Sequence, residues 1–197
     1  MITLNPLELG LALLVIVLVI ALIIIMLRKR RDTADLKNRF GQEFSRTLQD
    51  VGDERKAAAV LHEREKRVSQ FDIRPVSPED RERFSTAWTK VQAQFVDDPA
   101  GAVSRADVLL GEIMETRGYP VTDFNQRSAD LSVDHPTVVQ NYRAAHDIAT
   151  NHARGAAGTE DLRQAMIHYR SLFDDLVNDR ASSDIASGPT NGIRTRG

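Results

Sequence analysis

The stretch DDPAGAVSRADVLLGEIMETRG, residues 97–118, decides the fold of this 197-residue chain. Asp98-Pro99 is a helix start, because aspartate caps free N–H groups and proline suits the first helical position, and Gly118 is a stop. Between them the apolar residues cover a broad arc, namely Ala102, Val103, Ala106, Leu109, Leu110, Ile113 and Met114. A helix with so broad an apolar surface is expected at the centre of a bundle.

Segments on both sides of this helix carry the same signals. Starts occur at Ser77-Pro78, Thr122-Asp123, His135-Pro136 and Thr159, and stops at Gly155 and, less sharply, Asn178. Apolar residues recur at helical spacing within them: Phe84, Trp88, Val91 and Phe95; Val138, Val139, Tyr142, Ala145 and Ala149; and Leu162, Ala165, Met166, Tyr169, Phe173 and Leu176. No segment alternates apolar and polar residues. The pattern predicts an all-α fold, with a five-helix bundle-like domain over residues 71–178 that begins with an extended stretch, 72–75.

Residues 32–70 read as a long helix or a helix pair. Phe40, Phe44, Val51, Ala58, Leu61 and Val68 follow a 4-3 heptad spacing. Thr47, Glu54 and Glu65 interrupt the seam, and Gly52-Asp53 is a plausible break. A stalk, a weak coiled coil, or a helix packed on the domain or on a partner chain would each give this pattern, and we favour packing.

The N-terminal region contains a run without charge, residues 9–27, closed by the basic residues Arg28, Lys29, Arg30 and Arg31. About 20 helical residues span the roughly 30 Å of a bilayer's hydrocarbon core. A cleaved signal peptide would carry its basic residues before the run. Residues 1–31 are therefore expected to form an uncleaved transmembrane helix, with these four basic residues at the membrane interface.

The same four basic residues orient the helix, because basic residues stay on the cytoplasmic side. We expect a single-pass protein of a bacterial inner membrane, with its N-terminus outside and its domain in the cytoplasm; an extracytoplasmic domain is the alternative. The C-terminal residues 179–197, rich in Ser, Gly, Thr and Arg, are expected to be disordered.

Composition narrows the function classes. Residues 1–31 carry a net charge of +3, so the chain total of −2 leaves about −5 on the remainder. Nucleic-acid binding by bulk charge is not expected, because phosphate contacts need a basic face. The chain has no cysteine, which excludes disulfides, thiol catalysis and cysteine metal sites.

The histidines and paired acids are the remaining candidates for chemistry. His146 and His152 are six residues apart and point away from each other, and His62, His135 and His168 lack metal-ligand spacing. Hydrogen-bonded core or capping roles are expected for them. Asp97-Asp98 and the pair Asp130 and Asp134 are interpreted as helix caps rather than acid–base pairs. Gly111, Gly155 and Gly158 are too scattered for a phosphate loop. No catalytic, cofactor or metal site is predicted.

Four segments carry a family resemblance: FVDDPAGAV at 95–103, RGYP at 117–120, DLSVDHP at 130–136 and YRAAH at 142–146. They resemble a family of uncharacterised bacterial membrane-anchored helical proteins, over residues 40–177. The resemblance implies a bacterial source. It implies no activity and no site residue.

These observations predict a non-enzymatic, membrane-anchored helical protein. Its domain is expected to bind a protein partner or a second copy, and its N-terminal helix to contact lipid. The alternative is a small-molecule-binding or enzymatic domain with a pocket between helices, using His146, Asp130 or Tyr142.

Overall fold

The computed structural model describes residues 14, 16–20, 22 and 32–178, and every regular element among them is a helix. The all-α prediction is thus confirmed. The chain divides into two compact units, residues 1–61 and residues 62–197. The division falls within the helix α3 (Glu54–Val68).

Glycines interrupt the helical segments that precede the bundle. Residues 32–40 are helical, Gly41 breaks the helix with a φ of +50°, and α2 (Gln42–Val51) follows. Gly52 ends α2 in the left-handed conformation, and Asp53 then accepts a hydrogen bond from the Lys56 N–H at 2.9 Å at the start of α3. The predicted break at Gly52-Asp53 is confirmed. Residues 32–70 are therefore not one long helix, and the heptad seam is interrupted twice.

Five helices follow in residues 71–178, as predicted: α4 (Pro78–Gln94), α5 (Pro99–Arg117), α6 (Phe124–Asp134), α7 (Val139–Ala153) and α8 (Thr159–Asn178). Ser77, Asp98 and Asp123 cap α4, α5 and α6 through their side chains. The start expected at His135-Pro136 is wrong by one turn, because residues 136–138 form a turn and α7 begins at Val139 without a side-chain cap.

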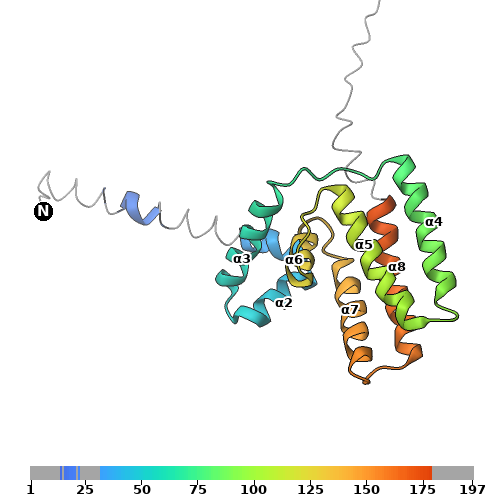
Figure 1. The fold of residues 1–197 in the computed structure, drawn as a ribbon. Coiled ribbons are helices and arrows are strands. Elements are labelled where there is room, and N and C mark those ends of the chain that lie inside the picture. Colours follow the sequence, from blue (N-terminus) through green and yellow to red (C-terminus); the bar gives the residue numbers. More distant parts are fainter. Residues whose placement is uncertain (1–13, 15, 21, 23–31, 179–197) are drawn as a thin grey trace, which may run out of the picture. The chain divides into compact units, whose positions relative to one another are not determined.

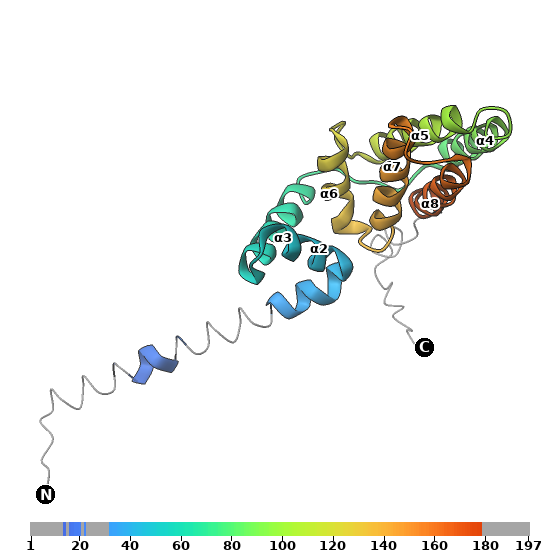
Figure 2. The same cartoon turned by 90° about the horizontal axis from the view of Figure 1, so that it is seen from below.

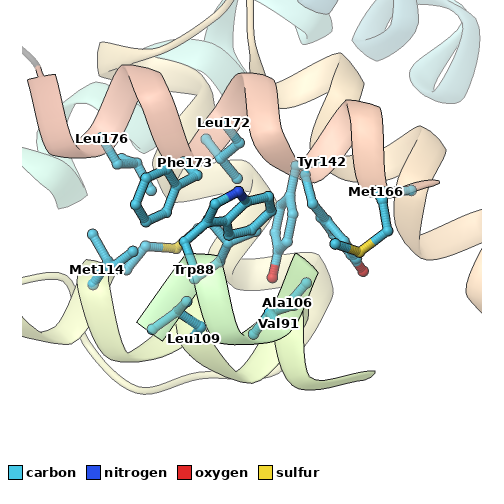
Figure 3. Packing of buried hydrophobic residues seen from close by; sticks show 14 of the residues in the cluster. Trp88, Val91, Ala106, Leu109, Met114, Tyr142, Met166, Leu172, Phe173 and Leu176 are labelled. Atoms are coloured by element: carbon cyan, nitrogen blue, oxygen red, sulfur yellow. The ribbon is translucent and has the colours of Figure 1, made fainter. Parts of the chain in front are cut away.

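The five helices enclose one apolar core. Both views show α4 with α5, and α7 with α8, as antiparallel pairs (Figure 1 and Figure 2). The helix α5 packs against α4, α7 and α8, and α6 packs against α7. Figure 3 shows Trp88 beside Phe173 in the core, and their rings stack with centroids 4.8 Å apart. The central position predicted for α5 is confirmed.

Two arginines bind the last carbonyls of α8. The last carbonyls of a helix have no partner within the helix. Arg117 of α5, which is 1% exposed, donates to the Leu176 carbonyl at 2.8 Å, and Arg81 of α4 donates to the Val177 carbonyl at 3.2 Å. Three helices are thereby joined at one end of the bundle.

The extended segment before α4 crosses the end of α5. The Arg74 N–H donates to the Arg117 carbonyl at 2.8 Å. Gly118 ends α5 with a φ of +100°, and a Cβ there would lie 2.2 Å from the Asp72 carbonyl oxygen. Only glycine meets both requirements, the left-handed φ and the close backbone approach.

Several predicted features fall on residues that the structure does not describe. The run 9–27 lies mostly outside the described residues, and Arg28, Lys29, Arg30, Arg31 and the tail 179–197 lie wholly outside them. Within the described part of the chain, no helix combines the length and the apolar character needed to cross a membrane.

Trp88 gives a test of the core. Its ring is 1% exposed, and its Nε1 has no hydrogen-bond partner among the described residues. We expect Trp88→Ala to lower the free energy of unfolding by about 3–5 kcal/mol through loss of buried contacts. Trp88→Phe should lose less than about 1.5 kcal/mol, because it keeps a stacking ring and removes an unsatisfied donor.

The measurement is urea unfolding of the chain followed by circular dichroism rather than by fluorescence, since Trp88 is the sole tryptophan. Ser85→Ala, at an exposed position of α4, serves as the control and should change stability by less than about 0.5 kcal/mol. Equal losses for Trp88→Ala and Trp88→Phe would contradict this account.

Candidate functional site

The three residues named for an interhelical pocket, His146, Asp130 and Tyr142, make different polar and ring contacts. The His146 ring stacks on Phe124, with centroids 3.5 Å apart. Asp130 is buried, and its Oδ1 accepts hydrogen bonds from Arg67 Nε at 3.0 Å and Gln126 Nε2 at 2.7 Å. Tyr142 is buried, and its hydroxyl accepts from Arg127 Nη1 at 3.0 Å. His146 and Tyr142 therefore both lie against Phe124, whose ring centroid is 5.0 Å from that of Tyr142, whereas Asp130 is bonded to Arg67 and Gln126.

The other histidines make local polar contacts. The Nδ1 atom of His62 lies 3.1 Å from Glu65 Oε2, and that of His135 lies 2.5 Å from Asp175 Oδ2. The Nδ1 atom of His152 lies 2.8 Å from the Ala157 carbonyl oxygen, and that of His168 lies 3.0 Å from Asn141 Oδ1. Among the described residues, no three histidine or acidic side chains are grouped so that they could hold a metal ion.

The capping interpretation holds for only part of the acidic pairs. Asp98 accepts from the Gly101 N–H at 2.9 Å and caps α5. Asp130 lies inside α6 instead, and Asp134 is the last residue of α6 and accepts from the Tyr119 hydroxyl at 2.9 Å. Capping is therefore wrong for Asp130 and Asp134, because α6 begins at Phe124 and both residues lie beyond its first turn.

A different feature emerges on the outer side of α5. A hollow of about 270 Å³ lies between one stripe of α5, the loop after it and Arg127 of α6. We call it the α5 hollow; it is lined by Asp107, Val108, Gly111, Glu112, Met114, Glu115, Tyr119, Pro120, Val121 and Arg127. The α5 residues of this list form two neighbouring rows in which the spacing is four and then three, namely 107, 111 and 114, and 108, 112 and 115, so they share one helix face.

Gly111 makes room for the Arg127 side chain. A Cβ at Gly111 would lie 3.4 Å from Arg127 Nη1 and 3.8 Å from its Cζ. Arg127 also donates through Nη2 to the Thr122 carbonyl at 3.0 Å. The Arg127 guanidinium therefore lies over α5 and is hydrogen-bonded both to Tyr142 of α7 and to the Thr122 carbonyl in the loop after α5.

A polar network connects this guanidinium to the core. Tyr142 and Tyr169 are fully buried, with ring centroids 6.1 Å apart. The Tyr169 hydroxyl donates to Asp107 Oδ1 at 3.3 Å, and Asp107 lines the α5 hollow. A carboxylate and a guanidinium at the hollow are therefore each hydrogen-bonded to a buried tyrosine, which fixes their positions.

Burial sets the ionisation of both tyrosines. Desolvation, followed by the nearby Asp107 charge, raises the pKa of Tyr142 and of Tyr169 far above the usual value of 10.0, and Arg127 opposes the shift. Both phenols consequently remain neutral donors or acceptors at physiological pH. They act as fixed hydrogen-bonding groups.

The α5 hollow combines apolar walls with a negative charge. Val108 is 50% exposed and Val121 is 75% exposed, so both valines present methyl groups to solvent at its rim. Three carboxylates line it against one guanidinium. Glu112 is partly balanced by Arg105, at 3.4 Å. The arrangement suits contact with an apolar group that lies next to a positive charge.

Sequence reasoning missed this hollow. Gly111 was one of several scattered glycines, and Val108 lay beside the apolar arc of α5. The available signal was a glycine in mid-helix, where it costs about 1 kcal/mol relative to alanine unless packing requires it. The crossing of Arg127 over that glycine depends on the tertiary structure.

The tyrosine network predicts a loss of stability at high pH. Above about pH 10 the unfolded chain releases phenolic protons that the folded chain keeps, so the free energy of unfolding falls as the pH rises. We expect Tyr142→Phe with Tyr169→Phe to flatten this fall, although it lowers stability at neutral pH through lost hydrogen bonds.

Urea unfolding at several pH values between about 8 and 11 measures this slope. All other residues are shared by both chains and leave the difference between the slopes unchanged. Identical slopes in the two chains would contradict buried, neutral phenols.

No protein-family model matches this chain, and neither a curated protein nor a solved structure matches it. The family resemblance carried by the four sequence segments, and the bacterial source it implies, therefore stay predictions. Function must be argued from the chain's own residues, among them those at the α5 hollow.

Proposed function

We propose that this protein is a single-pass inner-membrane protein whose cytoplasmic helical domain binds a protein partner or a second copy of itself. One observation carries the membrane part. Within the run 9–27, the described residues are helical, and seven aliphatic side chains are 49–60% exposed: Leu14, Ile16, Val17, Leu18, Val19, Ile20 and Leu22.

These side chains surround the helix. Residues 16–20 alone cover more than one turn, so aliphatic groups face every direction. Burying one such side chain away from water is worth about 1.5–3 kcal/mol. A helix that is apolar all round needs an apolar environment, and lipid supplies one along the whole run. The basic residues 28–31 support an orientation with the domain in the cytoplasm.

The α5 hollow supports a binding role for the domain. Small-molecule sites usually occupy about 300–1,000 Å³, and the hollow, at about 270 Å³, lies just below that range. One or two side chains of another protein would fill it. The exposed Val108 and Val121 at its rim are the kind of apolar surface that protein interfaces cover.

Membrane retention tests the anchor, and neutralising the basic residues tests its orientation. In the full chain with a C-terminal reporter active in one compartment, we expect membrane retention after alkaline washing and a cytoplasmic reporter signal. Changing Arg28, Lys29, Arg30 and Arg31 to Gln should mix the orientations, because the charge asymmetry that sets topology is lost.

Arg55→Gln with Lys56→Gln is the control. Both residues are exposed and lie beyond the 15–20 residues in which basic side chains influence topology, so the orientation should not change. Recovery of the unaltered protein in the soluble fraction would contradict the anchor, and a periplasmic reporter signal would contradict the orientation.

Cross-linking in native membranes tests the binding role. We expect the solubilised protein to carry a stoichiometric partner or to have the mass of an oligomer in light scattering. A monomeric mass with no cross-linked protein would count against an interaction function.

A further inference from the structure

The α5 hollow has a shape that defines what it can accept. Gly111 contributes no side chain to the lining, and Val108 and Val121 rise beside it from α5 and from the following loop. Isolated exposed valines are ordinary on a protein surface. Two of them at the rim of one concavity form a contact surface for an aliphatic side chain.

The charges that line the hollow indicate which residues of a partner lie next to that aliphatic side chain. Asp107, Glu112 and Glu115 line it, and Arg127 is the one basic residue in the lining. The Arg127 guanidinium already donates to Tyr142 and to Thr122, which directs part of its charge inward. Complementary charge on a partner favours association and fixes its orientation. Acidic partners would be repelled.

The hollow is also held in shape before anything binds. Arg127 is fixed by two hydrogen bonds, and Asp107 by the bond from Tyr169, whose ring is in the core. A site whose walls are already ordered loses less entropy on binding.

From this geometry we infer that the α5 hollow docks a partner-protein segment in which an aliphatic side chain lies next to lysine or arginine. The aliphatic group contacts Val108 and Val121, and the basic groups lie near Glu115 and near Glu112, which Arg105 balances only in part at 3.4 Å. The inference rests on the proposed interaction function and specifies the chemistry of its partner.

Two short peptides serve as probes. One is a capped pentapeptide with leucine between two lysines, and the other has glutamates in place of the lysines. The full chain is placed in nanodiscs of phosphatidylcholine, a lipid without net charge, so that the lysine peptide is not drawn to the bilayer. Titration is followed through the NMR signals of the valine methyl groups.

We expect the lysine peptide to shift the Val108 and Val121 methyl signals in a saturable way. The glutamate peptide should bind at least about tenfold more weakly. Equal binding of the two peptides would overturn the inference, as would the absence of any shift at these two valines up to about 10 mM peptide.

Surface variants give matched controls. Val121→Ser should weaken the lysine peptide about threefold or more, whereas Val96→Ser should not, although Val96 is 82% exposed in the loop before α5. Glu112→Gln with Glu115→Gln should remove most of the preference for lysine over glutamate. An undiminished preference, or equal effects of the two valine variants, would overturn the inference.

The two proposals can fail separately. If a partner is cross-linked in native membranes and the Val121 and Glu112/Glu115 variants capture it equally well, the interaction function stands and the α5 hollow is not its site. If no partner is found and the mass is monomeric, the interaction function fails. The peptide titration still tests the hollow's chemistry directly.

Discussion

Burial of α5 between α4, α7 and α8 is the constraint on which the rest of residues 62–178 depends. A helix surrounded by three others must be apolar over most of its surface, and the residues of its broad arc are nearly all inaccessible to solvent. The ends of α5 are defined by the cap at Asp98 and by Gly118 against the Asp72 carbonyl. The stripe that does not face the core then forms the α5 hollow.

Arginines join the helices where apolar packing alone would leave polar groups without partners. Arg117 and Arg81 bind the last carbonyls of α8, and Arg127 binds the Tyr142 hydroxyl. Charged donors form the stronger hydrogen bonds, and they suit the negative end of a helix. Each arginine comes from a different helix than its acceptor, so these bonds specify one arrangement of the bundle.

The sequence predicted the elements with good accuracy where the signal was local. The starts at Ser77, Asp98 and Asp123 were correct because capping depends on residues three apart. The start of α7 was misplaced by one turn, because a proline permits a helix to begin without requiring it. Asp130 was assigned to a helix cap although α6 begins at Phe124, and its actual partner Arg67 is 63 residues away, where no local pattern reveals such a pair.

The sequence by itself determined the all-α class, the central helix, the break at Gly52 and the expectation of an N-terminal membrane anchor, since periodicity, caps and apolar runs are properties of neighbouring residues. Only the tertiary structure decided that Asp130 pairs with Arg67, and that Arg127 crosses Gly111 beside two exposed valines. Those relations join different helices, and their geometry follows from how the core packs. The candidate binding surface therefore depends on the tertiary structure, whereas the helices that form it could be predicted from the sequence.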